Sequence, residues 1–583
     1  MKNDTAKIEN PKIGVFICHC GVNIGGYIDV PKVVKETKKL PGVVYAEGNL
    51  YTCSSDGIQK IKEAIEKHNL NRVVVASCTP RTHEVLFRET CEDAGLNKYL
   101  FEMANIREHC SWVHMQVPKE ATKKAIGIVR MAVAKAWYLQ PQEESEVQVT
   151  PTSLVIGAGI SGMRAALSLA YQGFRVYLID REPEIGGMLK DIYKLYPTGD
   201  EASEFLGSVS RAVRVHNNIE VYSSTEIEEI KGYIGNFEVS ALQNGKDKIT
   251  FRVGTIIVAT GAEEFKPKGM FGYGHHKNVI TQLELEKLLK KGLSPEIKKV
   301  VMIQCVGAME EQGREYCSKV CCTVALKNAL LIKEANPEAD VYILYRHLQA
   351  YGKDYEDYYR RTQEKDVKFI NYLPNRKPTV DVRTNNQLTV NVYHTFINRE
   401  IKLDSDLVVL STPLIQHESN KAMSSALKVP LGANGFFLEA HVKLKPVDFA
   451  TDGIFVCGTA HSPKAVAESI IQALAAASSA AIPMVKRKVR SEAITAVVDE
   501  ELCRGCGRCE KVCEYSAITL EEKMLKVEPF IRAKMLLSRV NEVVCKGCGS
   551  CSSVCPTGAI TMKHFTDKQI LAQIKAAFGG ESN

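Results

Sequence analysis

The sequence has little of what secreted and membrane proteins usually carry. Its first eleven residues, Met1 to Pro11, are polar and contain no apolar segment of the kind that a secretory signal peptide needs. The most apolar long stretch, 465–485, is rich in alanine and contains Glu468 and Gln472. A buried helix explains this stretch better than a membrane span does. We therefore expect a cytoplasmic protein without a transmembrane segment.

The sequence also lacks a strong excess of charge of one sign. It has 75 Lys and Arg against 68 Asp and Glu, which gives a formal net charge of +7, and no basic run supports binding to nucleic acid. The chain has 583 residues, of which 45% are hydrophobic and 25% charged. This composition is ordinary for a globular protein, and the length predicts about three or four domains.

Cysteine, in contrast, is abundant, with 19 residues. Thiols are kept reduced in the cytoplasm, so clustered cysteines indicate metal or redox chemistry there rather than structural disulfides. The clearest pattern is C-x2-C-x2-C-x3-C, which occurs twice near the C-terminus. Its members are Cys503, Cys506, Cys509 and Cys513, followed by Cys545, Cys548, Cys551 and Cys555.

This double pattern predicts an α+β ferredoxin domain with two [4Fe–4S] clusters over residues 492–583, ending in a helical tail. In such domains the fourth cysteine of each run ligates the other cluster. One cluster would therefore be held by Cys503, Cys506, Cys509 and Cys555, and the second by Cys545, Cys548, Cys551 and Cys513. A zinc ribbon is the alternative, but it needs two pairs with a longer spacer and would leave half of these thiols unused.

A strand, a glycine-rich turn and a helix start follow one another at 153–162. Gly157 would make the turn, Gly159 would let the backbone approach a pyrophosphate, and Gly162 would allow close helix packing. The next strand, 175–179, ends in a carboxylate suited to ribose hydroxyls. One such motif is weak, but two further strand ends, at 259–261 and 451–458, accompany it. The cofactor-binding candidates are Gly157, Ala158, Gly159, Gly162, Asp180, Arg181, Gly187, Met188, Ala259, Thr260, Gly261, Gly458, Thr459 and Lys464.

Together these motifs resemble the two-dinucleotide-fold flavoprotein oxidoreductases, such as thioredoxin reductase, over residues 150–485. The resemblance implies a Rossmann-like α/β core that binds FAD. The parts of this core would be the first half of the FAD domain at 149–295, an inserted NAD-domain-like fold at 296–425, and the second half of the FAD domain at 426–488.

The inserted fold normally binds NADPH through its own glycine fingerprint, which this sequence lacks. The strand 298–303 runs instead into Gln304-Cys305-Val306-Gly307, and four cysteines appear in this region. They are Cys305, Cys317, Cys321 and Cys322. Our preferred interpretation is a third cluster beside the flavin. Buried thiols, or a redox-active Cys321–Cys322 pair, are the alternatives.

Residues 1–145 are predicted to form an additional α/β domain, with strands near 13–17, 43–45 and 73–76. Four cysteines, at positions 18, 20, 53 and 78, fall where an apolar strand or its extension ends. Because the carboxyl ends of parallel strands converge on one crevice, these thiols can meet there. Cys110 is a fifth candidate. The set under consideration is Cys18, Cys20, Cys53, Cys78 and Cys110.

Longer motifs make the resemblance specific. Residues 304–322 (QCVGAMEEQGREYCSKVCC), followed by 345–360 and a final ferredoxin domain, are similar to the A-type subunit of heterodisulfide reductase, and three N-terminal segments agree with that family. The family implies a [4Fe–4S] cluster in the N-terminal domain, ligated by four of the five cysteines there. It also implies that Lys464, in Ser462-Pro463-Lys464, lies near the flavin ring as the one catalytic candidate. A solvated loop lysine is the alternative.

Members of this family are FAD hubs of multi-subunit complexes that split electron pairs between ferredoxin and a thiol heterodisulfide. The resemblance implies B-type and C-type partner subunits, a hydrogenase or dehydrogenase module, ferredoxin as a partner, and a homodimer within the larger complex. Some members carry a further ferredoxin module in the flavin core, and no such cysteine motif lies between Gly187 and Gly254 here. Two other functions stay open: a conduit without electron bifurcation, and a stand-alone NAD(P)H-dependent oxidoreductase, against which the missing fingerprint argues.

Overall fold

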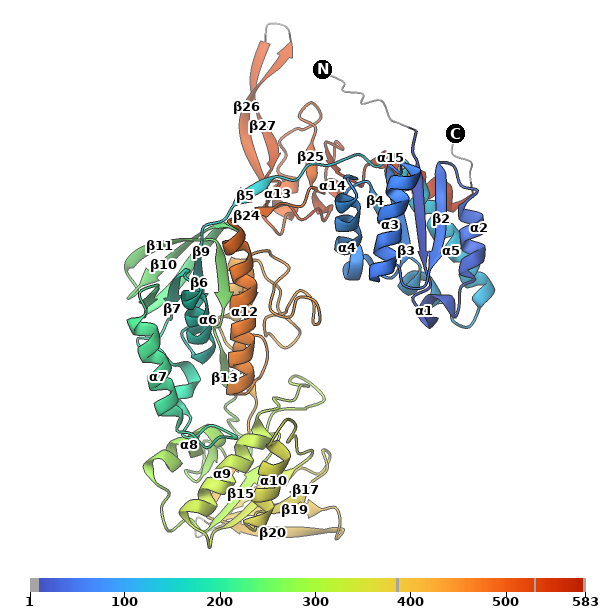
Figure 1. Cartoon of the computed structure of the whole chain (residues 1–583). Helices are drawn as coiled ribbons and strands as arrows, with labels where there is room; N and C mark the ends of the chain where they lie inside the picture. The colour runs from blue at the N-terminus through green and yellow to red at the C-terminus, as the bar shows by residue number, and fades with distance from the viewer. Residues whose placement is uncertain (1–9, 384–386, 529–530, 580–583) are drawn as a thin grey trace. The chain divides into compact units, whose positions relative to one another are not determined.

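A computed structural model describes residues 10–383, 387–528 and 531–579 (Figure 1). The chain divides into two compact units. The first comprises Met1–Glu146 and Arg490–Asn583, and the second comprises Val147–Val489. The N-terminal and ferredoxin domains therefore belong to one unit, and the flavin core forms the other.

The first unit begins with a parallel four-stranded sheet in the order β2-β1-β3-β4. Its strands are β1 (Ile13–Cys18), β2 (Val43–Asn49), β3 (Arg72–Ser77) and β4 (Phe101–Asn105). The two central strands are buried along their whole length, as is typical of parallel sheets that helices cover on both faces. The main helices are α2 (Val30–Thr37), α3 (Ser55–His68), α4 (Pro80–Asp93) and α5 (Pro118–Ala136), with the short α1 (Val22–Gly25) and η1 (Arg107–Ser111) at strand ends.

The ferredoxin domain brings its two cysteine motifs into one small core. Strand β25 (Ala496–Val498) before the first motif pairs antiparallel with β28 (Ile560–Met562) after the second. A hairpin of β26 (Ile518–Glu528) and β27 (Ile531–Val540) separates the motifs, and each motif runs into a short helix. These helices are α13 (Arg508–Val512) and α14 (Ser550–Ser553).

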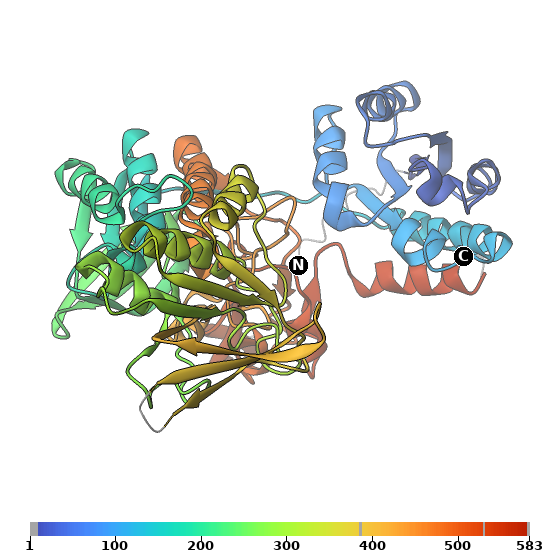
Figure 2. The ribbon, with the colours of Figure 1, turned by 90° about the horizontal axis from the view of Figure 1, so that it is seen from below.

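The tail helix α15 (Asp567–Ala577) lies along α5 of the N-terminal domain, as the red and light blue helices show in Figure 2. A buried charge cluster joins the same two domains. Glu102 Oε2 lies 2.8 Å from Lys135 Nζ and 3.2 Å from His564 Nε2. A buried carboxylate is tolerated when cations and hydrogen bonds surround it, so this cluster fixes the tail against the N-terminal domain.

The second unit contains two domains of the same design. The flavin domain has a parallel five-stranded sheet, β23-β12-β6-β7-β8, and an antiparallel sheet, β11-β10-β9. Its strands are β6 (Thr152–Ile156), β7 (Arg175–Ile179), β8 (Ile219–Tyr222), β9 (Thr225–Tyr233), β10 (Asn236–Gln243), β11 (Asp247–Val253), β12 (Thr255–Val258) and β23 (Ile454–Val456). Its helical segments are α6 (Ile160–Tyr171), η2 (Gly187–Asp191), α7 (Ala202–Val215), α11 (Asn420–Leu427), η3 (Gly458–Ala460) and α12 (Val466–Lys486).

Helix α12 is the apolar, alanine-rich stretch of the sequence. Among the described residues it alone has the length and composition that would suffice to cross a membrane. One face of α12 packs against α6 and the flavin sheet, and Ala473, Ala476 and Ala480 on that face are fully buried. Small side chains allow the two helices to approach closely, so α12 is a core helix of the flavin domain.

The inserted domain repeats the design with the parallel sheet β14-β21-β15-β16-β17 and the antiparallel sheet β18-β19-β20. Its strands are β14 (Val279–Thr281), β15 (Lys299–Ile303), β16 (Asp340–Tyr345), β17 (Lys368–Asn371), β18 (Thr379–Val382), β19 (Leu388–His394), β20 (Arg399–Ser405) and β21 (Leu407–Leu410). Its helices are α8 (Gln282–Lys291), α9 (Cys321–Ala335) and α10 (Tyr355–Glu364).

The inserted domain begins earlier than the expected boundary at residue 296. Strand β14 and helix α8 already belong to it, because β14 pairs with β21, which lies more than a hundred residues further along the chain. The chain passes between the two domains through the antiparallel pair of β13 (Ala262–Glu264) and β22 (Leu414–Gln416). Local sequence pattern cannot reveal such a long-range pairing, which explains the displaced boundary.

Candidate functional site

The glycine-rich turn between β6 and α6 is built so that only glycine fits at two of its positions. A Cβ at Gly157, whose φ is +101°, would lie 2.4 Å from Ala259 O, and one at Gly162 would lie 1.8 Å from Gly157 O. At Gly159 the nearest atom to such a Cβ is Gly187 Cα at 3.9 Å. The space above Gly159 is therefore open, and it leads to the N-terminus of α6, which favours a pyrophosphate.

Three further strand ends surround this turn. Asp180, after β7, accepts a hydrogen bond of 2.6 Å from the amide of Ala158 through Oδ2. Thr260, after β12, has a buried hydroxyl oxygen without a partner in the structure. A Cβ at Gly458, after β23, would lie 2.2 Å from Ser161 Oγ. An open glycine turn beside an unpartnered hydroxyl and a carboxylate fits a dinucleotide such as FAD.

The remaining predicted nucleotide contacts lie around the same turn. Thr459 Oγ1 is 3.8 Å from the position that a Cβ of Gly261 would take, so these two segments adjoin. Met188 is half-buried in η2, directly after Gly187. Arg181 is more exposed and pairs with Glu418 at 3.3 Å, so of this set it has the weakest claim to a nucleotide contact.

Lys464 lies between η3 and α12 and is enclosed by polar groups. Its Nζ is 2.5 Å from Ser462 Oγ and 3.0 Å from His461 Nδ1. Burial, together with the nearby cation of Lys319, lowers the pKa of Lys464 to about 8. A buried amine of this kind differs from a solvated loop lysine, which keeps an ordinary pKa, and perturbed groups of this kind often mark functional sites.

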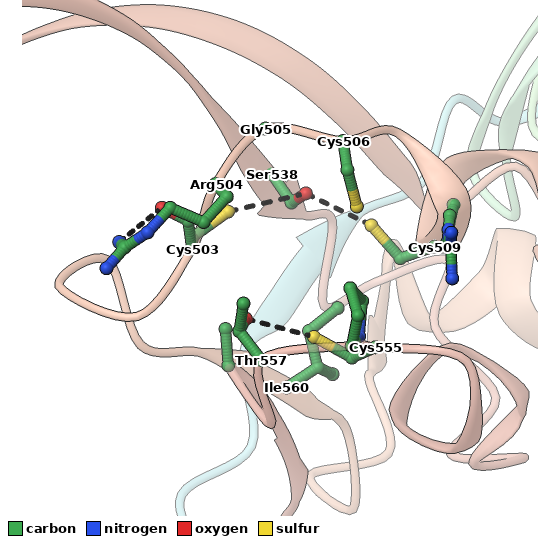
Figure 3. A pocket seen from close by; sticks show the side chains of 12 residues that line it. Cys503, Arg504, Gly505, Cys506, Cys509, Ser538, Cys555, Thr557 and Ile560 are labelled. Atoms are coloured by element: carbon green, nitrogen blue, oxygen red, sulfur yellow. Dashed lines mark hydrogen bonds between the residues drawn. The ribbon is translucent and has the colours of Figure 1, made fainter.

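Four cysteines of the ferredoxin domain surround one hollow. Figure 3 shows the thiols of Cys503, Cys506, Cys509 and Cys555 around this hollow. This is the set that the ferredoxin pattern assigns to one cluster. Although burial acts to raise the pKa of Cys555, hydrogen bonds from Thr557 and nearby backbone amides lower it overall, which favours the thiolate that a cluster iron requires.

A buried hydroxyl also approaches two of these thiols. Ser538 Oγ, from β27, lies 3.0 Å from Cys509 Sγ and 3.8 Å from Cys503 Sγ (Figure 3). A hydroxyl that donates to a ligating sulfur stabilises its negative charge and tunes the cluster. Sequence analysis missed Ser538, because it lies in the intervening hairpin and no spacing rule connects it to the motif.

The second set of ferredoxin cysteines also converges. Burial and the neighbouring thiols of Cys545, Cys548 and Cys513 raise the pKa of Cys551 to about 11. The structure thus brings Cys513 of the first run to the three leading cysteines of the second. This exchange of the fourth cysteine is the arrangement expected for a two-cluster ferredoxin.

A second hollow lies at the carboxyl end of β15 in the inserted domain. All four cysteines of this region line it, together with Gln304 and His347. They are Cys305, Cys317, Cys321 and Cys322. Burial raises the pKa of Cys305 to about 11, while the adjacent Arg346 opposes that rise. Bringing four thiols to one hollow fits a cluster better than it fits four unrelated core thiols.

In the N-terminal domain four of the five candidate cysteines lie together. Cys18 Sγ accepts backbone N–H bonds from Cys20 at 3.3 Å and Thr52 at 3.4 Å, and Cys20 Sγ accepts one from the Arg107 guanidinium at 3.5 Å. Burial raises the pKa of Cys53, and the thiols of Cys18 and Cys20 raise it further. Several N–H donors directed at sulfur are typical of a cluster site.

Cys78 belongs to the same group. Burial raises the pKa of its thiol, the charge of Arg107 lowers that pKa, and the thiol of Cys20 raises it. Cys110, in contrast, is fully buried and donates through Sγ to Ala121 O at 3.0 Å. The thiols of Cys18, Cys20, Cys53 and Cys78 thus interact with one another, whereas the hydrogen bond of Cys110 goes to the backbone of α5.

Within the described ranges, no group of three or more His, Cys, Asp or Glu side chains is placed to hold a single metal ion. Two of the cysteine sets each surround a hollow instead. A multi-atom cluster fits such hollows better than a mononuclear zinc site, which needs four ligands in contact with one ion.

Comparison with known proteins defines the class of this chain. Residues 151–480 match the family model described as pyridine nucleotide-disulphide oxidoreductase, and residues 496–562 match the 4Fe-4S dicluster domain. The chain is thus a flavoprotein oxidoreductase of the pyridine nucleotide-disulphide type joined to a 4Fe-4S dicluster domain. Among solved structures, the thioredoxin reductase of T. acidophilum is 17% identical, covers 58% of this chain and 100% of its own, and has a TM-score of 0.40.

Two relatives make the identification specific. The A-type subunit of the H(2):CoB-CoM heterodisulfide,ferredoxin reductase of Methanothermobacter marburgensis is 40% identical, over 98% of this chain and 98% of its own. The A-type subunit of the H(2)/formate:CoB-CoM heterodisulfide,ferredoxin reductase of Methanococcus maripaludis is 37% identical, over 88% of this chain and 92% of its own. The chain belongs to the family of A-type subunits of heterodisulfide reductase.

Proposed function

We propose that this chain is the flavin hub of a heterodisulfide-reductase-type complex, with four [4Fe–4S] clusters in addition to FAD. The hub divides electron pairs from a donor between ferredoxin and a disulfide-type acceptor, or combines them in reverse. The names of its relatives specify hydrogen or formate, ferredoxin and a heterodisulfide. By similarity, the partners are B-type and C-type subunits, a hydrogenase or dehydrogenase module and ferredoxin, with two copies of this chain in the complex.

One observation carries the proposal. The hollow lined by four cysteines occupies the end of β15, the place where a nicotinamide-binding domain has its glycine turn. Helix α9 begins there at Cys321 without a side-chain cap, so its free amides and dipole face the hollow. An anionic cluster with thiolate ligands benefits from this position, whereas a pyrophosphate finds no glycine turn to approach.

The residues of the chain have distinct tasks in this function. Bound FAD supplies the ability to exchange electrons either in pairs or singly. Gly159, Asp180 and Thr260 bind and orient the nucleotide part, and Lys464 offers N–H groups at the ring. The cysteine sets hold the clusters, and the Ser538 hydroxyl donates to the Cys509 sulfur of one of them. The substrate chemistry belongs to the partner subunits.

The first experiment measures cofactor content. The anaerobically purified full chain, reconstituted with iron, sulfide and FAD, is expected to contain about sixteen iron atoms and one FAD, at four iron atoms per cluster. Reconstituted Cys18→Ser and Cys317→Ser variants should each lose about four iron atoms. A content of about eight would restrict the clusters to the ferredoxin domain and contradict the proposal.

The second experiment separates bifurcation from simple conduction. A spectroelectrochemical titration of the holoprotein resolves the two one-electron potentials of the bound flavin. A bifurcating flavin has crossed potentials, in which the second electron enters more easily than the first. Uncrossed potentials, with a stable one-electron form, would favour a conduit that only connects its partners.

A further inference from the structure

A hydrogen-bonded chain of three side chains runs from Lys464 through His461 to Glu439. His461 Nδ1 lies 3.0 Å from Lys464 Nζ, and His461 Nε2 lies 2.7 Å from Glu439 Oε2. Glu439 belongs to the segment between α11 and β23, 22 residues before His461. Two remote segments are thus joined behind the lysine, in the loop that directly follows the flavin contact of η3.

The network fixes the protonation of the histidine. Gln472 Nε2, on α12, also lies 3.0 Å from His461 Nδ1. Because an ammonium group has only donors, Nδ1 is the acceptor toward Lys464, and Nε2 then carries the hydrogen that Glu439 accepts. Burial and the charge of Lys464 lower the pKa of His461, which agrees with a neutral imidazole.

Glu439 in turn is fixed as a carboxylate. Although burial alone would raise its pKa, the hydrogen bond from His461 and the charge of Lys464 lower it. Its side chain is 14% exposed and that of His461 is 18% exposed. The carboxylate holds the neutral histidine, and the histidine in turn orients the buried amine, as in other active sites where one group positions the next.

We propose that Glu439 and His461 are positioning residues that hold the Lys464 ammonium in one orientation toward the flavin ring. A lysine has three N–H donors, and Nζ here contacts His461, Ser462 Oγ and, at 3.3 Å, Ser462 O. The last and longest contact is the one that a flavin acceptor replaces. This inference rests on the proposed function, since it assumes FAD bound at the turn of Gly157–Gly162.

The positioned cation has a thermodynamic consequence. Two-electron reduction leaves negative charge on the flavin ring, and an oriented ammonium stabilises that charge more than it stabilises the oxidised ring. The reduction potential of the flavin is therefore higher with the network intact. Lys464 keeps its proton in this role, so no proton transfer along the network is required.

The test is the reduction potential of FAD in the reconstituted full chain, with FAD and iron contents measured on the same samples. Lys464→Met is expected to shift the oxidised-to-reduced ratio at a fixed potential by about ten- to hundredfold toward the oxidised form. For a two-electron couple this corresponds to about 30 to 60 mV. His461→Leu and Glu439→Leu should produce a smaller shift of about three- to tenfold in the same direction.

A double-mutant cycle distinguishes positioning from an independent effect. In the Lys464→Met background, His461→Leu should cause no further shift, because the group it positions is gone. His461→Gln, whose amide oxygen can still accept from Nζ, should recover most of the parent potential. His275→Leu, on an exposed turn, serves as the control.

Two results would overturn the inference while leaving the proposed function intact: an unchanged potential in His461→Leu, or a full additional shift in the double variant. Failure of the proposed function looks different. It would be a parent chain that binds no FAD or lacks the iron of the additional clusters, and it would remove the inference as well.

Discussion

The flavin domain and the inserted domain each have a five-stranded parallel sheet and a three-stranded antiparallel sheet, yet they differ at the ends of two equivalent strands. After β6 the chain continues as Gly157-Ala158-Gly159, and after β15 it continues as Gln304-Cys305-Val306. In both domains the first amide after the strand donates to the neighbouring strand, from Gly157 to Ile179 O and from Gln304 to Leu344 O. The framework is therefore shared, and only the side chains at the crevice differ.

The two domains also differ at the end of the next strand, where the side chains have opposite charges. Asp180 follows β7 and accepts from the glycine turn, whereas Arg346 follows β16 and is 6% exposed beside Cys305. An acidic group there suits ribose hydroxyls, and a cation there suits thiolates and an anionic cluster. One architecture thus supports two kinds of redox group, because strand ends of an α/β sheet accept different side chains without a change of fold.

The largest effect is expected for Cys321→Ser, which tests whether the cysteine site and the FAD site are separate. It should remove one cluster, about four iron atoms, and leave FAD bound, because the glycine turn lies in the other domain. Iron content and flavin absorbance of the same sample provide the measurement. Cys91→Ser is the matched control, since Cys91 is fully buried in α4, outside all of the cysteine sets. Loss of FAD together with the iron would contradict the separation of the two sites.

The converse substitution is Gly159→Ala in the flavin domain. The added Cβ meets only Gly187 Cα at 3.9 Å, so the fold should tolerate it, but the Cβ occupies the approach of the pyrophosphate. We expect at least about tenfold weaker FAD binding with unchanged iron content. Gly127→Ala, in α5, where an added Cβ meets nothing within 4 Å apart from the backbone of its own helix turn, is the control. Retained FAD affinity would show that the nucleotide does not use this turn.

The third prediction concerns the reductant. Because Cys305 and its neighbours occupy the nicotinamide position of the inserted domain, neither NADH nor NADPH should reduce the flavin rapidly. Anaerobic stopped-flow mixing of the holoprotein with excess of each nucleotide measures the rate. Bleaching on the order of 1 per second or faster would restore the stand-alone NAD(P)H oxidoreductase as the better function.

The smallest effect is expected when the side-chain cap of one helix is removed. Helix α8 has a capping box, in which Thr281 Oγ1 accepts from Glu284 N and Glu284 Oε2 accepts from Thr281 N. Helices α6 and α9 have no side-chain cap, which leaves their N-termini to bound groups. Thr281→Ala should weaken α8 by about 1 kcal/mol, measured as roughly fivefold faster hydrogen exchange of its first amides. Equal exchange in both proteins would show that the cap adds nothing.

Much of this molecule could be predicted from local sequence. The ferredoxin ligands and the glycine turn follow from spacing alone, since a cluster loop and a βα turn are each formed by a few consecutive residues. The boundary of the inserted domain could not be predicted, because β14 joins its sheet only through β21. The fifth cysteine of the N-terminal domain could not be separated from the others by spacing, since no fixed spacing connects the five.

The sequence by itself determined which chemical groups this protein has: eight cysteines in ferredoxin spacing, one glycine fingerprint, and cysteines in place of a second fingerprint. Only the tertiary structure decided which of these groups meet. Cys110 donates to Ala121 O, whereas the thiols of Cys18 and Cys20 act on Cys53, and His461 forms hydrogen bonds with both Glu439 and Lys464. The physical reason is that local spacing fixes a turn, whereas contacts between distant segments depend on how sheets and helices pack.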